Sequence, residues 1–126
     1  MPKTYNILSV EDDDDQFELI KIALKGMPLD IRRARNGDEA LAAVAQSKPD
    51  LMLLDLTLPD MRGWDVLNWL SANGNALENV PVLVLTAHTE SSHRVIARLR
   101  EVAQYINKPF VPSVLRNTIK QILKIV

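Results

Sequence analysis

The chain has 126 residues, 47% of them hydrophobic, which suits one compact domain over residues 1–126. Its 15 basic and 16 acidic residues leave a formal charge of −1, so no global field would attract nucleic acid or an anionic membrane. The absence of cysteine excludes disulfides and thiol nucleophiles, and no apolar run approaches the roughly 18 to 20 residues of a membrane span. No signal peptide is visible, so we expect a cytoplasmic protein that neither inserts into membranes nor binds nucleic acid directly.

Short strand-like runs alternate with segments of helical periodicity along the chain. In the first unit, residues 5–10 are strand-like, and Phe17, Ile20 and Leu24 then repeat at helical spacing until Gly26. The same patterns predict strands at residues 5–10, 29–34, 51–56, 82–85 and 105–106. They predict five helices, within residues 13–25, 35–48, 64–70, 93–100 and 115–126. Alternating strands and helices imply right-handed crossovers, and hence a doubly wound α/β fold with a five-stranded parallel sheet.

The third predicted strand carries one charged residue. Residues 51–56 are apolar at every position except Asp55, and a continuous apolar run is typical of a parallel strand buried on both faces. Aspartate is almost never fully buried unless it is paired. Asp55 is therefore a candidate functional carboxylate, and the alternative is a structural aspartate satisfied by hydrogen bonds.

Polar residues also follow the other strands at their carboxyl ends. Glu11 and Asp12 follow the first strand, Thr86 the fourth and Lys108 the fifth. In doubly wound sheets ligands bind at this edge, and convergent charges in a cleft mark a site. We therefore expect these side chains to meet Asp55.

Four motifs, in order, resemble the receiver domains of two-component response regulators, and the chain resembles a stand-alone receiver of the chemotaxis type. The motifs are "ILSVEDDDD", "LMLLDLTLPDMRGWDVL", "VPVLVLTAH" and "YINKPF". This resemblance implies a single receiver domain with a flavodoxin-like sheet of strand order 2-1-3-4-5. It also implies the following roles: Asp55 as phosphate acceptor, Thr86 and Lys108 as phosphate-contacting residues, Glu11 and Asp12 as a metal-binding pair, and Thr86 with Tyr105 as the switch.

The three carboxylates have a chemical requirement of their own. Packed together they repel one another unless a cation lies between them. Mg²⁺ is the expected cation, because it prefers hard oxygen ligands and accepts carboxylates, waters and phosphate oxygens. We expect Asp12 and Asp55 to bind it directly and Glu11 through water, and the resemblance adds the backbone carbonyl of Thr57.

The remaining acids of the run begin the first helix. Asp13, Asp14 and Asp15 stand where a carboxylate caps free N–H groups and complements the helix dipole. Asp13 has a second interpretation, as an outer-shell residue of the metal site.

Each assignment made through the resemblance has a plainer alternative. Lys108 alone would be a solvated lysine, Thr86 a helix cap and Tyr105 a core residue. The resemblance also favours a cis bond between Lys108 and Pro109. Receivers usually carry Gly-Ala before the switch aromatic, whereas this chain has Glu101 and Val102, which leaves the preceding loop's geometry open.

The function expected from these residues is transfer of a phosphoryl group from a sensor histidine kinase or phosphotransfer protein onto Asp55. The domain would catalyse only its own phosphorylation and dephosphorylation, and it would not otherwise be an enzyme. A dehalogenase-like phosphatase would place a second aspartate two residues after the nucleophile, where this chain has Thr57. A receiver-like interaction module that is never phosphorylated would be expected to lack an acid, the acceptor or the lysine, all of which are present.

The signal is expected to leave through the fourth helix, the fifth strand and the fifth helix, toward a downstream protein or a second copy. Two groups of basic residues mark this surface: Arg94 with Arg98, and a basic stripe of Arg116, Lys120 and Lys124. Solvated helix faces often look the same. No output domain follows the last helix, so we expect either a stand-alone receiver or a fragment of a larger regulator.

Overall fold

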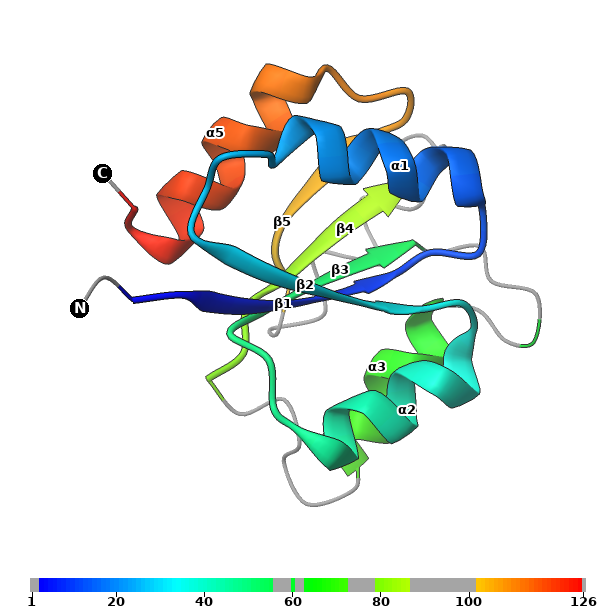
Figure 1. The fold of residues 1–126 in the computed structure, drawn as a ribbon. Coiled ribbons are helices and arrows are strands. Elements are labelled where there is room, and N and C mark those ends of the chain that lie inside the picture. The colour runs from blue at the N-terminus through cyan, green and yellow to red at the C-terminus, as the bar shows by residue number, and fades with distance from the viewer. Residues whose placement is uncertain (1–2, 56–59, 61–62, 73–78, 87–101, 126) are drawn as a thin grey trace.

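The computed structural model describes residues 3–55, 60, 63–72, 79–86 and 102–125 (Figure 1). Within these ranges the chain forms five strands and four helices. In order they are β1 (Tyr5–Val10), α1 (Asp14–Ala23), β2 (Leu29–Ala34), α2 (Gly37–Gln46), β3 (Leu51–Asp55), α3 (Gly63–Ala72), β4 (Val82–Thr86), β5 (Val102–Asn107) and α5 (Pro112–Leu123). The predicted fourth helix, residues 93–100, lies outside the described residues.

The strands form one parallel sheet in the order β2-β1-β3-β4-β5, which confirms the predicted topology. Helices α1 and α5 cover one face, and α2 and α3 cover the other (Figure 1). Because all strands run in the same direction, their carboxyl ends lie along one edge. In the described part of the chain, no helix has the length and apolar character to cross a bilayer.

The central strand β3 is buried at all five positions, as its continuous apolar sequence predicts. Its alternate residues supply two separate cores. Met52 and Leu54 pack toward α2 and α3, whereas Leu51 and Leu53 pack toward α1 and α5. Each such side chain contributes roughly 1.5 to 3 kcal/mol through burial, so Asp55 ends a strand that is held firmly in the core.

Strand β5 is longer than the sequence predicted. It extends over Val102–Asn107 rather than residues 105–106 alone. Pairing with β4 holds these residues in extended conformation, with a register shift between Val82 and Leu83. Backbone pairing with a neighbour leaves little trace in the hydrophobic pattern of an edge strand, and this explains the short prediction. Helix α5 likewise begins before its apolar pattern does, with Pro112 in its first turn.

Candidate functional site

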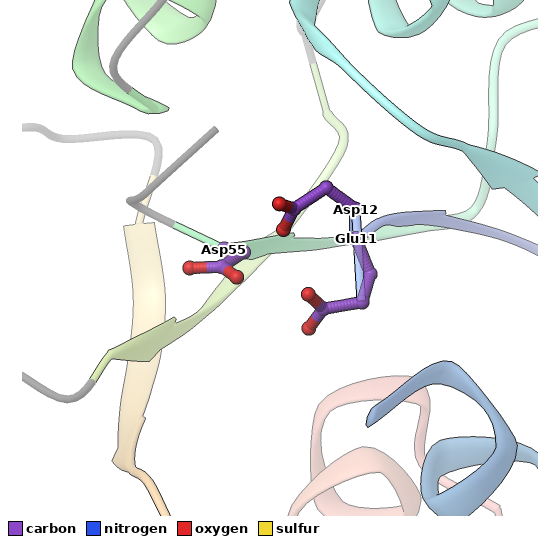
Figure 2. A group of neighbouring side chains, drawn as sticks. All are labelled: Glu11, Asp12 and Asp55. Carbon is purple, nitrogen blue, oxygen red and sulfur yellow. The ribbon is translucent and has the colours of Figure 1, made fainter. Parts of the chain in front are cut away.

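Three carboxylates gather at the ends of β1 and β3. Glu11 directly follows β1 and is 1% exposed, while Asp55 ends β3 and is 6% exposed. Asp12 is exposed. One oxygen from each of the three lies within 4.8 Å of the others. Figure 2 shows the three side chains at the ends of their strands. The sheet thus brings together the acids that the sequence predicted to meet.

Lys108 completes this cluster from the loop after β5. Its Nζ lies 2.7 Å from Oδ2 of Asp55 and 3.3 Å from Oε1 of Glu11. The side chain is 17% exposed, so Lys108 is not the solvated surface lysine of the alternative interpretation. The Lys108–Pro109 peptide bond is cis, in agreement with the expectation.

The charges of the site perturb one another. Burial raises the pKa of Glu11 to about 7, assisted by its hydrogen bond with Asp55 and by repulsion from that carboxylate; Lys108 acts in the opposite direction. Burial alone would lower the pKa of Lys108, but Asp55 and Glu11 outweigh it and raise that pKa. With all three carboxylates ionised, the acids and Lys108 together would carry two formal negative charges, which a divalent cation would neutralise.

The start of α1 organises the rest of the acidic run. Asp13 is the N-cap residue, and its Oδ1 accepts a hydrogen bond of 3.1 Å from the backbone N–H of Gln16. The N–H of Asp13 donates to Oε2 of Glu11 at 3.3 Å. The capping interpretation of Asp13 is therefore confirmed, and its backbone helps to hold the neighbouring Glu11 carboxylate.

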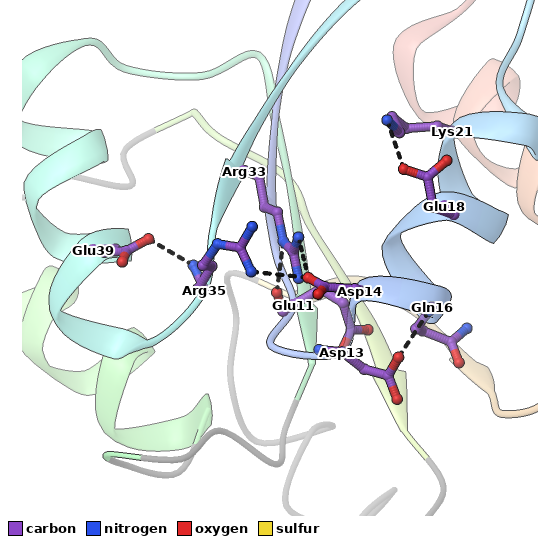
Figure 3. A network of polar contacts seen from close by, with 9 residues as sticks. All are labelled: Glu11, Asp13, Asp14, Gln16, Glu18, Lys21, Arg33, Arg35 and Glu39. Carbon is purple, nitrogen blue, oxygen red and sulfur yellow. Dashed lines mark hydrogen bonds and ion pairs between the residues drawn. The ribbon is translucent and has the colours of Figure 1, made fainter.

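Asp14 does more than complement the helix dipole. Its Oδ1 accepts from Arg33 at 2.7 Å and from Arg35 at 2.8 Å, two arginines near the end of β2 (Figure 3). Hydrogen bonds from Arg33 and then Arg35 lower the pKa of Asp14 below its usual value. This network was not predicted from the sequence, in which two arginines near the end of a predicted strand were the only indication of it.

The remaining predicted residues are placed only in part. Thr86 ends β4, where its backbone pairs with Asn107, and Tyr105 lies in β5 opposite Val84. The side chains of Thr86 and Tyr105 lie outside what the structure describes. So do Thr57, Arg94, Arg98 and Glu101 as whole residues.

Asp60 is a further residue that the sequence analysis missed. It lies in the segment between β3 and α3, and its carboxylate accepts from the N–H of Gly37 at 2.8 Å and from that of Asp38 at 3.1 Å. Asp60 is thereby attached to the first turn of α2. An acid shortly after a turn proline was the only sequence signal, and it does not identify the partner.

Comparison with known proteins agrees with this arrangement. The family model described as the response regulator receiver domain matches residues 7–120. The polar-differentiation response regulator DivK of Brucella anthropi is 32% identical over 123 residues, which are 98% of each chain. The DNA-binding response regulator MtrA of Mycolicibacterium smegmatis is 39% identical over 107 residues, 85% of this chain; the match spans only 45% of MtrA.

A solved structure shows the same fold. The CheY-like response regulator receiver domain protein of Methanospirillum hungatei superposes with a TM-score of 0.84 at 25% sequence identity, covering 97% of this chain and 95% of that one. The family match extends over nearly the whole chain, and the strand order and clustered acids are consistent with it. The chain belongs to the family of response regulator receiver domains, the signalling domains of two-component systems.

Proposed function

We propose that Asp55 accepts a phosphoryl group from a sensor histidine kinase or a histidine phosphotransfer protein, and that this changes the binding of a downstream partner. One observation carries the proposal. Asp55 ends a fully buried strand, 2.7 Å from an ammonium group and beside two further carboxylates. This position combines a nucleophile with the charges that a phosphoryl group requires.

In the proposed transfer, a carboxylate oxygen of Asp55 forms a bond to phosphorus as the bond from phosphorus to the donor's imidazole nitrogen breaks. The electron pair of the broken bond leaves with the imidazole. Lys108 is held beside Asp55 before transfer, so its charge needs little rearrangement to meet the incoming phosphoryl oxygens. The reaction modifies the domain itself, and no separate substrate is turned over.

The residues present fit Mg²⁺. The cluster offers only oxygen ligands, which Mg²⁺ prefers, and it brings oxygens of three carboxylates within 4.8 Å of one another. Asp12 and Asp55 would hold the ion directly, Glu11 through water, and the carbonyl of Thr57 would be a further ligand. When bound, the ion supplies positive charge that offsets the charge of the phosphoryl oxygens.

The output is proposed to pass from Thr86 to Tyr105 and to the surface of the fourth helix, β5 and α5. The backbone positions support this route, because Thr86 ends β4 beside β5, the strand that contains Tyr105. A phosphoryl group on Asp55 would draw the Thr86 hydroxyl toward it and leave room for Tyr105 to rotate. A histidine kinase uses ATP to phosphorylate its own histidine, and we therefore place the domain in the cytoplasm.

Intact mass spectrometry after treatment with acetyl phosphate and Mg²⁺ tests the assignment. We expect one phosphoryl group on the wild type, none on Asp55→Asn, and one on the control Asp38→Asn, whose aspartate is exposed on α2. Persistence of the added mass in Asp55→Asn would place the acceptor elsewhere. A wild-type chain that binds Mg²⁺ but never gains mass would favour an interaction module that is not phosphorylated.

A further inference from the structure

We propose that Arg33 is a positioning residue for the divalent cation, because it fixes the peptide group that joins Glu11 to Asp12. This inference rests on the proposed magnesium site but concerns a residue of β2 that is not itself a ligand. Nε of Arg33 donates a hydrogen bond of 3.1 Å to the backbone carbonyl oxygen of Glu11. Figure 3 shows Arg33 reaching from β2 toward the start of α1.

The acceptor of this bond decides its effect. The carbonyl of Glu11 belongs to a planar peptide group that also contains the Cα atom of Asp12. Fixing the carbonyl oxygen therefore fixes the direction in which the chain continues from one acid to the next. On its other side, the N–H of Glu11 donates to the carbonyl of Ala34 at 2.9 Å. Strand β2 thus holds both sides of Glu11 just beyond the last paired residue of β1.

Arg33 is itself held rigidly. The centre of its guanidinium group lies 4.7 Å from the centroid of the Phe17 ring, and its Nη1 lies 2.7 Å from Oδ1 of Asp14. Its side chain is only 14% exposed. A planar guanidinium held from two directions loses little further freedom when its Nε donates, so it is well suited to orient a backbone group.

The positioning role and the charge of Arg33 have opposite effects on cation binding. A positive charge near the acids repels Mg²⁺, so electrostatics alone predicts that a neutral residue at position 33 would tighten binding. If the bond to the Glu11 carbonyl positions the acids, its loss should weaken binding instead. The sign of the change therefore separates the two effects.

Two substitutions of similar size isolate the hydrogen bond. In Arg33→Gln, the side-chain nitrogen occupies the same place along the side chain as Nε and can still donate. In Arg33→Met, a methyl group stands at that place. Both remove the charge and the contact with Asp14. Arg35→Met is the matched control, because Arg35 also pairs with Asp14, whereas it is Arg33 that donates to the carbonyl of Glu11.

The experiment is calorimetric titration of the full chain with MgCl₂, together with urea unfolding of each variant. We expect Arg33→Met to weaken Mg²⁺ binding by about three- to tenfold, the range of one lost hydrogen bond. Arg33→Gln should remain within about twofold of the wild type, and Arg35→Met should bind as tightly as the wild type or more tightly. Similar unfolding midpoints for the Gln and Met variants would show that a difference in stability does not explain their difference in Mg²⁺ affinity.

Tighter or unchanged Mg²⁺ binding in Arg33→Met would overturn the proposal, and so would equal weakening by Gln and Met. A wild-type chain that binds no Mg²⁺ would overturn it together with the metal site. If the wild type binds Mg²⁺ and becomes phosphorylated while the two Arg33 variants behave alike, only the role of Arg33 fails. The two proposals can thus be separated.

Discussion

The ammonium group of Lys108 lies 2.7 Å from Oδ2 of Asp55, although 53 residues separate them in the sequence. The contact follows from the sheet, because β3 and β5 run parallel and end at the same edge. The ammonium stabilises the buried carboxylate in the absence of any other cation. It also adds positive charge at the place where Mg²⁺ and the phosphoryl group are proposed to bind.

Replacement of Lys108 should therefore change two measurements in opposite directions. In Lys108→Met, we expect Mg²⁺ to bind several-fold more tightly, since an ammonium group no longer repels it. Phosphorylation by acetyl phosphate should slow by about tenfold or more, because the phosphoryl oxygens lose a positioned cation. Calorimetry and the time course of intact mass measure the two effects, with the exposed Lys48→Met as control. Weaker Mg²⁺ binding would instead mean that Lys108 assembles the metal site.

The sheet and the central charges were predictable because each depends on a simple pattern. The apolar residues 51–54 predict a buried strand whatever surrounds it, and parallel strands place Asp55 and Lys108 at one edge. Contacts made by single side chains outside the regular elements were not predictable. The bonds of Asp60 to α2 depend on the path of a loop and on side-chain conformations, which hydrophobic periodicity does not specify.

The raised pKa of Glu11 predicts a pH dependence of the metal-free protein. Burial and the nearby Asp55 raise that pKa from 4.5 to about 7, so the folded state favours the protonated acid. The resulting stabilisation is complete below the unfolded pKa and is lost as the pH rises through the folded pKa. In chelator, the free energy of unfolding should therefore fall by on the order of 1 to 2 kcal/mol between about pH 5.5 and 8.

Urea unfolding of Glu11→Gln provides the control, because the amide cannot ionise. The free energy of unfolding of Glu11→Gln should not show this part of the pH dependence. Mg²⁺ should stabilise the wild type more at the higher pH, since the cation binds the ionised carboxylate. An identical pH dependence in the wild type and Glu11→Gln would show that other groups are responsible.

Asp60 should contribute to stability through α2. The first four N–H groups of a helix lack partners within it. Here Asp60 accepts from the N–H groups of Gly37 and Asp38, and the side chain of Asn36 accepts from that of Glu39. We expect Asp60→Ala to lower the free energy of unfolding by about 1 to 2 kcal/mol. Asp38 is an exposed acid in the same first turn, so Asp38→Ala should lower the free energy of unfolding by only a few tenths of a kcal/mol. Equal losses in the two variants would contradict the capping role of Asp60.

Arg116 should act in folding rather than in partner binding. The sequence placed it in the basic stripe, but its Nη1 donates to the carbonyl oxygens of Lys25 at 2.8 Å and Ala23 at 3.3 Å. These carbonyls lie at the C-terminal end of α1, where acceptors lack helical partners and the helix dipole favours a cation. Arg116 therefore joins α5 to α1, and Lys124 is the exposed charge of the stripe.

Arg116→Met should lower the free energy of unfolding by about 1 kcal/mol, the usual contribution of such hydrogen bonds at a partly exposed position. Lys124→Met is the matched control, because Lys124 belongs to the same stripe but is exposed. It should leave stability unchanged within about 0.5 kcal/mol. If α5 presents its charge to an acidic partner, Lys124→Met should weaken that binding, and added salt should reduce the difference from the wild type. If both variants unfold at the same urea midpoint, Arg116 is a solvated surface charge and does not stabilise the fold.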